Sequence, residues 1–180
     1  MPDTAPRPSD VIADRLVLTD PHSRIRRHTA ADDAFCRTLF HEQRAPLFAA
    51  LGLGDEALRM WLDQQYQAQR TSFAQRFPVA ETCIVECAGA AVGRLVVTLG
   101  QPPEGTTLHL VDITLAAAAR NRGIGSDVIE SLARTGHALC ATRFTLLVLR
   151  SNEAALRLYQ RLGFVATVDG THVLMIRQLP

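Results

Sequence analysis

Residues 112–125 read Asp-Ile-Thr-Leu-Ala-Ala-Ala-Ala-Arg-Asn-Arg-Gly-Ile-Gly, and this stretch decides the fold prediction. The apolar run 108–115 that enters it is rich in β-branched residues, which is typical of a buried strand. Apolar residues then recur at helical spacing over 126–139. The basic turn between strand and helix aims backbone N–H groups at one point, which favours a phosphate or pyrophosphate. An ordinary tight turn would use the same glycines.

The rest of the chain predicts a mixed α/β domain around this stretch. Residues 1–22 carry four of the nine prolines and are expected to form a loose N-terminal tail, whereas 23–180 are expected to form one domain. The expected order is an edge strand (23–28), a helix from Thr29 that Pro46 interrupts, a helix (55–76), two strands (81–87 and 91–99), the strand and helix described above, a strand (144–149), a further helix and two closing strands.

Composition excludes several classes of function. A formal net charge of +1 over 180 residues gives no electrostatic reason to expect binding to nucleic acid or to an anionic membrane. No apolar run approaches the roughly 18 to 20 residues that span a bilayer, and the N-terminus shows no secretion signal. Cys83 and Cys87 have no second pair of metal-ligand spacing, so we expect free thiols, no metal and a reduced, cytoplasmic protein.

Two motifs carry a family resemblance. The run 120–125, Arg-Asn-Arg-Gly-Ile-Gly, resembles the Arg/Gln-x-x-Gly-x-Gly/Ala acyl-CoA signature of the GNAT N-acetyltransferases. Asn152, Tyr159 and the run Leu-Gly-Phe at 162–164 resemble the second motif of that family, one helix and one strand downstream. The resemblance implies the GNAT fold, in which about four helices flank a mixed sheet of about six to seven strands that is splayed at the cofactor site.

The resemblance also implies acetyl-CoA as co-substrate. Backbone N–H groups of the basic turn would bind its pyrophosphate, the edge of the preceding strand would pair with the pantetheine arm, and Asn152 would contact that arm or hold the splay. Arg120 and Arg122 would add positive charge. The cofactor-binding residues implied in this way are Ile113, Thr114, Leu115, Arg120, Asn121, Arg122, Gly123, Ile124, Gly125, Ser126, Asn152 and Tyr159.

Catalysis of direct acyl transfer needs a neutral amine, a donor to the oxyanion and a proton for the leaving thiolate. The resemblance places Tyr159 near the sulfur as the proton donor; a core aromatic is the other interpretation. Many family members use a Glu on the strand before the signature, and this chain has none between Gly105 and Gly125. Asp112 is therefore the tentative base and His109 the alternative. An α-amine with a pKa of about 7.7 to 8 needs no base at all.

The sequence thus predicts an acetyl-CoA-dependent N-acetyltransferase acting on a primary amine of a small molecule or peptide. A GNAT-like module that binds acyl-CoA without catalysis is the alternative. A dinucleotide fold would need a glycine at Val128, and a phosphate-binding P-loop would need Gly-Lys-Ser/Thr. Acceptor specificity is expected from residues 30–80, where Arg44, Trp61, Gln65 and Arg70 are available. A homodimer is possible by analogy.

Overall fold

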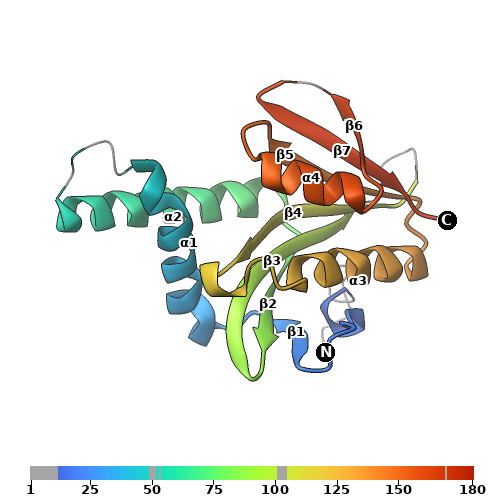
Figure 1. The fold of residues 1–180 in the computed structure, drawn as a ribbon, viewed down its shortest axis with the longest axis horizontal. Coiled ribbons are helices and arrows are strands. Elements are labelled where there is room, and N and C mark those ends of the chain that lie inside the picture. The colour runs from blue at the N-terminus through green and yellow to red at the C-terminus, as the bar shows by residue number, and fades with distance from the viewer. Residues whose placement is uncertain (1–11, 49–51, 53, 101–104, 169) are drawn as a thin grey trace, which may run out of the picture.

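The computed structural model describes residues 12–48, 52, 54–100, 105–168 and 170–180, which form a seven-stranded sheet in the order β1-β2-β3-β4-β5-β7-β6 (Figure 1). Neighbouring strands are antiparallel except β4 and β5, which are parallel. The predicted mixed sheet with about four helices is confirmed. The elements are β1 (Ser23–Arg27), α1 (Asp33–Phe48), α2 (Asp55–Arg76), β2 (Glu81–Cys87), β3 (Ala90–Gly100), β4 (Thr107–Leu115), α3 (Ile124–Ala138), β5 (Arg143–Leu149), α4 (Glu153–Arg161), β6 (Val165–Val168) and β7 (His172–Gln178).

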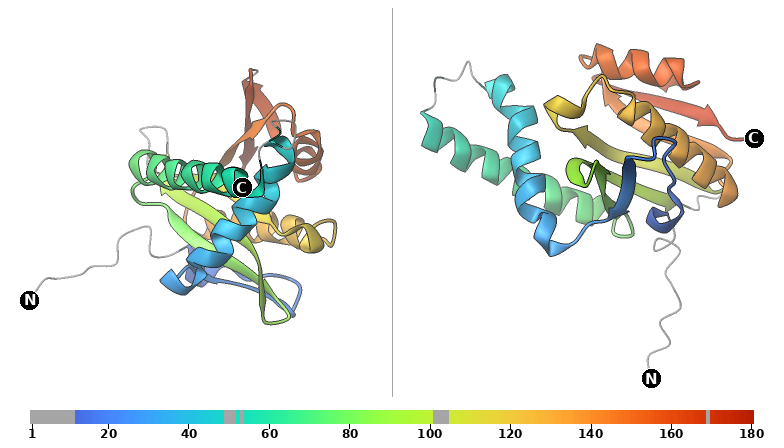
Figure 2. Two further views of the ribbon diagram at one scale, coloured as in Figure 1. Left: turned by 90° about the vertical axis from the view of Figure 1, so that its left-hand side faces the viewer. Right: turned by 60° about the horizontal axis from the view of Figure 1, so that its bottom comes forward.

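Two hydrophobic cores lie on opposite faces of the sheet. Alternation along β2 shows this directly, because Ile84 packs with α1 and α2 whereas Cys83 and Val85 pack with α3 and Tyr159 of α4. α1 and α2 cross at one end of the molecule, and α3 and α4 lie at the other (Figures 1 and 2). The arrangement leaves the middle of the sheet, where β4 meets β5, between the two helix groups.

The segment that begins at Ile12 is not the loose tail that the prolines suggest. Ile12 is 0% exposed in the larger core, and the Glu81 carboxylate accepts the N–H groups of Ile12 and Ala13 at 2.9 and 3.0 Å. Further along, Asp127 of α3 accepts the N–H of Thr19, and the segment lies beside α3 (Figure 2). Sequence patterning missed this packing because its anchors are distant carboxylates. Residues 1–11 of the predicted tail lie outside the described residues.

α1 also differs from its prediction, because it continues through Pro46 to Phe48. A proline removes its own backbone N–H donor, so within the last turn it loses one hydrogen bond without preventing the turn. α2 spans the predicted 55–76. The two helices together form a longer wall over the sheet than the sequence indicated.

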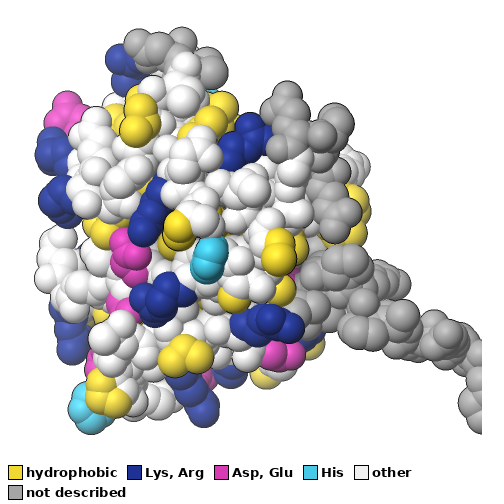
Figure 3. Space-filling model, turned by 90° about the vertical axis from the view of Figure 1, so that its right-hand side faces the viewer, with side chains coloured by type: hydrophobic (Ala, Val, Ile, Leu, Met, Phe, Trp, Pro, Cys, Tyr) yellow, Lys and Arg dark blue, Asp and Glu magenta, His cyan; other side chains and the backbone are white. Residues whose placement is uncertain are grey.

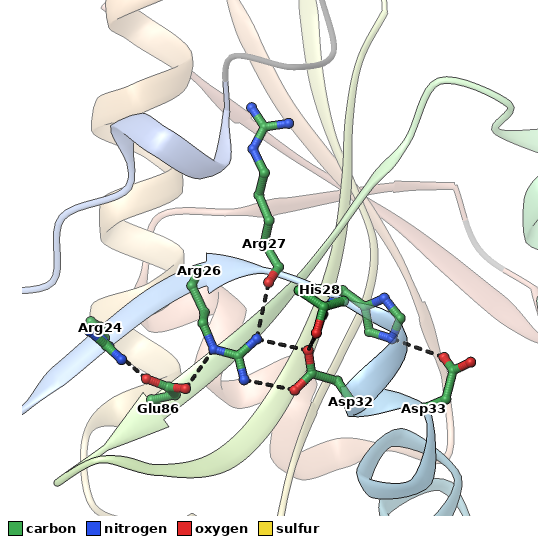
Figure 4. A network of polar contacts seen from close by, with 8 residues as sticks. Arg24, Arg26, Arg27, His28, Asp32, Asp33 and Glu86 are labelled. Carbon is green, nitrogen blue, oxygen red and sulfur yellow. Dashed lines mark hydrogen bonds and ion pairs between the residues drawn. The ribbon is translucent and has the colours of Figure 1, made fainter.

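An ion-pair network fixes the start of α1 against the sheet (Figure 4). Arg26 of β1 contacts Glu86 of β2 at 2.6 Å and Asp32 at 2.7 Å, while Arg24 contacts the other oxygen of Glu86 at 2.6 Å. Asp32 also accepts the N–H of Thr29 at 2.8 Å. The Arg26 guanidinium holds the pKa of Asp32 well below its usual range. Because β1 and β2 are part of the sheet, the network sets where the α1 wall begins.

The cysteines are structural or exposed thiols in the part of the chain described. Cys83 and Cys87 share one face of β2, as predicted, and both pack in the larger core. Burial raises the pKa of the Cys83 thiol to about 12, which keeps it protonated and unreactive. Among the described residues, no group of three or more His, Cys, Asp or Glu side chains is placed to hold a metal ion.

The face at the C-terminal end of the molecule carries hydrophobic side chains scattered among charged ones (Figure 3). This view offers no reason to place a partner there, so the homodimer remains a prediction. Of the helices described, none is long and apolar enough to cross a membrane.

Candidate active site

The parallel pairing of β4 with β5 ends halfway along β4. It runs from the Thr107–Arg143 pair to the Leu110–Leu146 pair, after which β4 stays with β3 and β5 stays with β7. A bulge at Val111 lies at the divergence, since Leu110 pairs with Val97 and Asp112 with Val96. Residues 113–115 therefore have an edge without a β5 partner, and apart from the Leu115 carbonyl, which Arg120 engages, its backbone groups are open to an extended ligand.

The glycine turn prepares the N-terminus of α3 for an anion. Gly123 adopts φ of 82°, which a residue with a side chain rarely does, and α3 begins at Ile124, two residues before the predicted start. The first N–H groups of the helix have no acceptor within it. A Cβ on Gly125 would lie 3.6 Å from Leu115, in van der Waals contact, so a side chain there would fill the space in front of the backbone. Arg120 donates from Nε to the Leu115 carbonyl at 2.9 Å and ties the turn to the end of β4.

Two cavities meet at the splay. The first, here called the channel, has a volume of about 300 Å³ and lies between the edge of β4, the glycine turn and α4. The second, here called the chamber, has a volume of about 320 Å³ and lies between α1, α2, β4 and β5. A ligand in one cavity would touch a ligand in the other. The residues that line both are Gln43, Ile113, Asn152, Ala155 and Tyr159.

Tyr159 stands where channel and chamber join. The residue is 7% exposed, and its ring packs edge-on against Phe164 with centroids 5.7 Å apart. Burial and, second, the charge of Asp112 raise the pKa of the phenol to about 12. The side chain is therefore a core aromatic whose hydroxyl stays protonated beside the cavities, and its role toward the sulfur stays a prediction.

Asp112 is held by a buried arginine that sequence reasoning missed. Arg94 of β3 contacts its Oδ2 at 2.7 Å and also donates to Gln69 of α2 at 3.0 Å. The Arg94 and Asp112 side chains are 8% and 20% exposed. In the described part of the chain, Oδ1 of Asp112 accepts no hydrogen bond. A single arginine inside the apolar run of β3 was the signal that could have revealed this partner.

His109 lies on the same face of β4 as Asp112. The two are three residues apart, but the bulge at Val111 adds one residue and so shifts the alternation of side chains by one position. Its Nδ1 is 2.9 Å from Oγ1 of Thr145, and its ring stacks on Phe77 at 5.5 Å. Burial and, second, the charge of Arg76 lower the pKa of His109, so the ring is neutral near pH 7. Thr145 also donates to the Leu108 carbonyl at 3.4 Å; if the hydroxyl keeps that bond, His109 carries its proton on Nδ1 and leaves Nε2 as an acceptor.

Asn152 caps α4, since its side-chain oxygen accepts the N–H of Ala155 at 3.2 Å. The cap holds the start of α4 at the open end of the splay. The amide nitrogen of Asn152 donates no described hydrogen bond and is available to a ligand in either cavity.

The four residues expected to choose the acceptor are brought together only in part, since Arg44 and Gln65 line one cavity beside the chamber. Arg44 lines the chamber, whereas Trp61 packs on Phe48 with ring centroids 4.1 Å apart. Gln65 lines a neighbouring cavity, and Arg70 lies in a further one, 3.7 Å from Asp33. The aromatic residues along α2 and at its C-cap also lie in different places. Tyr66 belongs to the core, but Phe73 and Phe77 line the chamber.

Comparison with known proteins identifies the class. The family model described as Acetyltransferase (GNAT) family matches residues 38–164, so the chain belongs to this family. No curated protein matches the chain.

Solved structures show the same fold. PaiA N-acetyltransferase from Thermoplasma acidophilum, in complex with coenzyme A, is 14% identical with a TM-score of 0.64 over 87% of this chain and 98% of that one. An acetyltransferase from Thermus thermophilus is 20% identical with a TM-score of 0.62 over 92% and 99%. A GNAT-family acetyltransferase from Streptococcus pneumoniae is 20% identical with a TM-score of 0.57 over 88% and 99%.

Proposed function

We propose that this GNAT-family protein transfers an acetyl group directly from acetyl-CoA to a primary amine of a small molecule or peptide. The observation that carries the proposal is the splay of β4 from β5. It leaves a strand edge at 113–115 free, in front of the α3 N-terminus and beside the buried phenol of Tyr159. Family membership supports the same activity.

The residues of the channel fit acetyl-CoA. Unpaired N–H groups at 124–126 suit a pyrophosphate, and Gly125 lets it approach the backbone. The free edge at 113–115 suits the pantetheine amides, and the amide of Asn152 can bond the same arm. When bound, acetyl-CoA supplies an acyl group activated as a thioester.

The chamber side would prepare the amine. Oδ1 of Asp112 attracts and orients the ammonium group of the acceptor, because its other oxygen is already engaged by Arg94. Nε2 of neutral His109 can accept a proton from it through water. A free N–H on the edge of β4 would stabilise the oxyanion. The roles of both residues therefore remain predictions: Asp112 orients the amine, and His109 accepts its proton.

Tyr159 would act on the leaving sulfur. A phenol with a pKa of about 12 is a weaker acid than an ordinary thiol with a pKa of about 8.5. Complete proton transfer from Tyr159 to the thiolate is therefore unfavourable. We propose that the phenol donates a hydrogen bond to the sulfur as negative charge develops on it.

The size of the chamber favours a small acceptor. Its volume of about 320 Å³ lies at the lower end of the roughly 300–1,000 Å³ range of small-molecule sites. We also propose a cytoplasmic location for the protein, because the cysteines described are free thiols.

The first test is ligand-induced stabilisation followed by turnover. Acetyl-CoA, but neither NAD nor ATP, should raise the unfolding temperature, and an amine panel should then release CoA from acetyl-CoA. CoA should be quantified by chromatography, because the exposed Cys140 would react with thiol reagents. The chain contains no lysine, so lysine self-acetylation adds no background, and a reaction without amine corrects for acetyl transfer to the exposed Cys140. Stabilisation without release for any amine would instead indicate a binding module.

A further inference from the structure

The chamber carries an excess of positive charge. Asp112 is the single carboxylate among its described lining residues, and Arg94 already neutralises it at 2.7 Å. Arg44 and Arg76 also line the chamber, and neither forms an ion pair within the described residues. His109 adds no negative charge. A ligand that complements these charges brings an anionic group of its own.

Arg44 is the better placed of the two arginines. It is half-buried, and its guanidinium lies over the Phe40 ring at 5.5 Å from the centroid, which limits the conformations that binding must fix. It follows Gln43, which lines both cavities. Arg44 also shares a neighbouring cavity with Gln69, whose side chain bonds the Arg94 partner of Asp112. Arg44 therefore lines the chamber beside Gln69, which bonds the arginine that holds Asp112.

Arg76 lines the chamber near His109, whose pKa its charge lowers. It follows Gln69 by seven residues along α2, a separation of about 10 Å on a helix. Its side chain is exposed and lies over Phe77 at 5.6 Å. An exposed charge is screened by water and salt, so Arg76 contributes a general field rather than a specific contact.

The β5 wall of the chamber is apolar and open to solvent. Leu147 and Leu149 are 48% and 42% exposed and both line the chamber, because β5 has no β4 partner after Leu146. Phe73 of α2 lines the same space. Such side chains gain from contact with an apolar part of the acceptor.

We propose that the acceptor is a small amino acid, or a close analogue, whose carboxylate adjoins the reacting amine and whose side chain is apolar. Arg44 binds the carboxylate, Asp112 orients the amine, and Leu147 and Leu149 contact the side chain. This assignment rests on the proposed acetyl transfer for its chemistry, but the recognition by Arg44 can be tested separately by binding.

The test uses matched pairs: leucine, methionine and phenylalanine, each against its carboxamide. Binding to the protein–CoA complex is measured by calorimetry, and transfer by CoA release. We expect each acid to bind more tightly than its amide and to have a kcat/KM about tenfold or more higher. The amide has the less basic amine and so the larger neutral fraction, which favours the amide in transfer; a kcat/KM preference for the acid therefore cannot come from amine ionisation. Glycine should react more weakly than leucine.

The Arg44→Gln variant should remove the preference. Its KM for the acids should rise about ten- to a hundredfold, while the KM for the amides and for acetyl-CoA stays unchanged. Arg44→Lys should restore part of the preference, and Arg76→Gln on the same wall should leave most of it. Unfolding temperatures of all three variants check that the fold is intact.

The outcomes separate this inference from the proposed function. Equal or tighter binding of the amides, or a preference that survives Arg44→Gln, would overturn the carboxylate assignment even if transfer occurs. Equal losses in Arg44→Gln and Arg76→Gln would also overturn it in favour of a diffuse field. If acids bind through Arg44 but no amine releases CoA, the recognition stands and the proposed transfer fails.

Discussion

The channel and the chamber meet at Tyr159 but are built in different ways. The channel offers a ligand the backbone of the β4 edge, the glycine turn and the start of α3, and it is also lined by side chains of α4 and by Gln43. The chamber is made of side chains from α1, α2, β4 and β5. Backbone chemistry is the same whatever the side chains are, whereas side-chain chemistry differs at every position. The channel is thus suited to a constant ligand and the chamber to a particular one.

The largest effect is expected from filling the channel. Gly125→Val would place methyl groups against Leu115 and Leu158, where acetyl-CoA must reach the backbone. Loss of two or more hydrogen bonds to a charged group should weaken CoA binding by about a hundredfold or more. Calorimetry with CoA measures this. Gly54→Val is the control, since a Cβ at that position meets open space. Unchanged affinity in Gly125→Val would separate the glycine turn from CoA.

The next largest effect is expected at Tyr159, where the channel and the chamber join. Tyr159→Phe should lower kcat roughly 10- to 100-fold through loss of a hydrogen bond that forms as the sulfur becomes charged, with little change in CoA affinity. Steady-state kinetics and calorimetry measure the two quantities. Tyr66→Phe is a matched control, because Tyr66 is the other tyrosine and lies buried in the α1–α2 core. If both variants behave alike, Tyr159 has no part in catalysis.

A smaller effect is expected within the chamber. Asp112→Asn should reduce kcat/KM about tenfold, and His109→Ala less, because Asp112 orients the amine directly. The asparagine leaves buried Arg94 without its counter-charge, so unfolding temperatures must accompany the kinetics. The double variant Arg94→Gln with Asp112→Asn removes that imbalance and isolates the kinetic effect. A larger loss in His109→Ala would make the histidine the principal base.

The same division explains what the sequence could predict. The glycines at 123 and 125 and the residues Asn152 and Tyr159 belong to two short local motifs, so most of the channel was predictable. The chamber depends on contacts between distant segments. Arg94 meets Asp112 only because β3 pairs with β4, and Arg44 reaches the chamber while Arg70, on the same helix pair, faces another cavity.

Two departures in the fold have the same origin. The segment after Ile12 is ordered by Glu81 and Asp127, which lie far along the chain, and no local pattern in residues 12–22 indicates those carboxylates. α1 tolerates Pro46 because the proline falls in its last turn, so that little of the helix depends on the missing donor. Sequence periodicity does not report the long-range partners of a residue or its position within a helix or strand.

The smallest effect is a pH dependence of stability from His109. The unfolded imidazole takes up a proton near pH 6.5, whereas the folded one does so only at lower pH, since its pKa is lowered. Between these values the unfolded state binds more protons, so stability should fall as the pH drops through this window. Urea unfolding of the wild type and His109→Gln at several pH values measures the difference. An identical pH dependence in both would mean that burial does not perturb His109.

The central claim is that channel and chamber serve one reaction across Tyr159. Its most direct test is CoA release from saturating acetyl-CoA as the concentration of an amino acid is varied, with mass spectrometry of the amine product. The account predicts release that depends on the amine, saturates with it and matches the acetylated amine mole for mole. Release that is independent of the amine, or absent with every amine although acetyl-CoA binds, would contradict it.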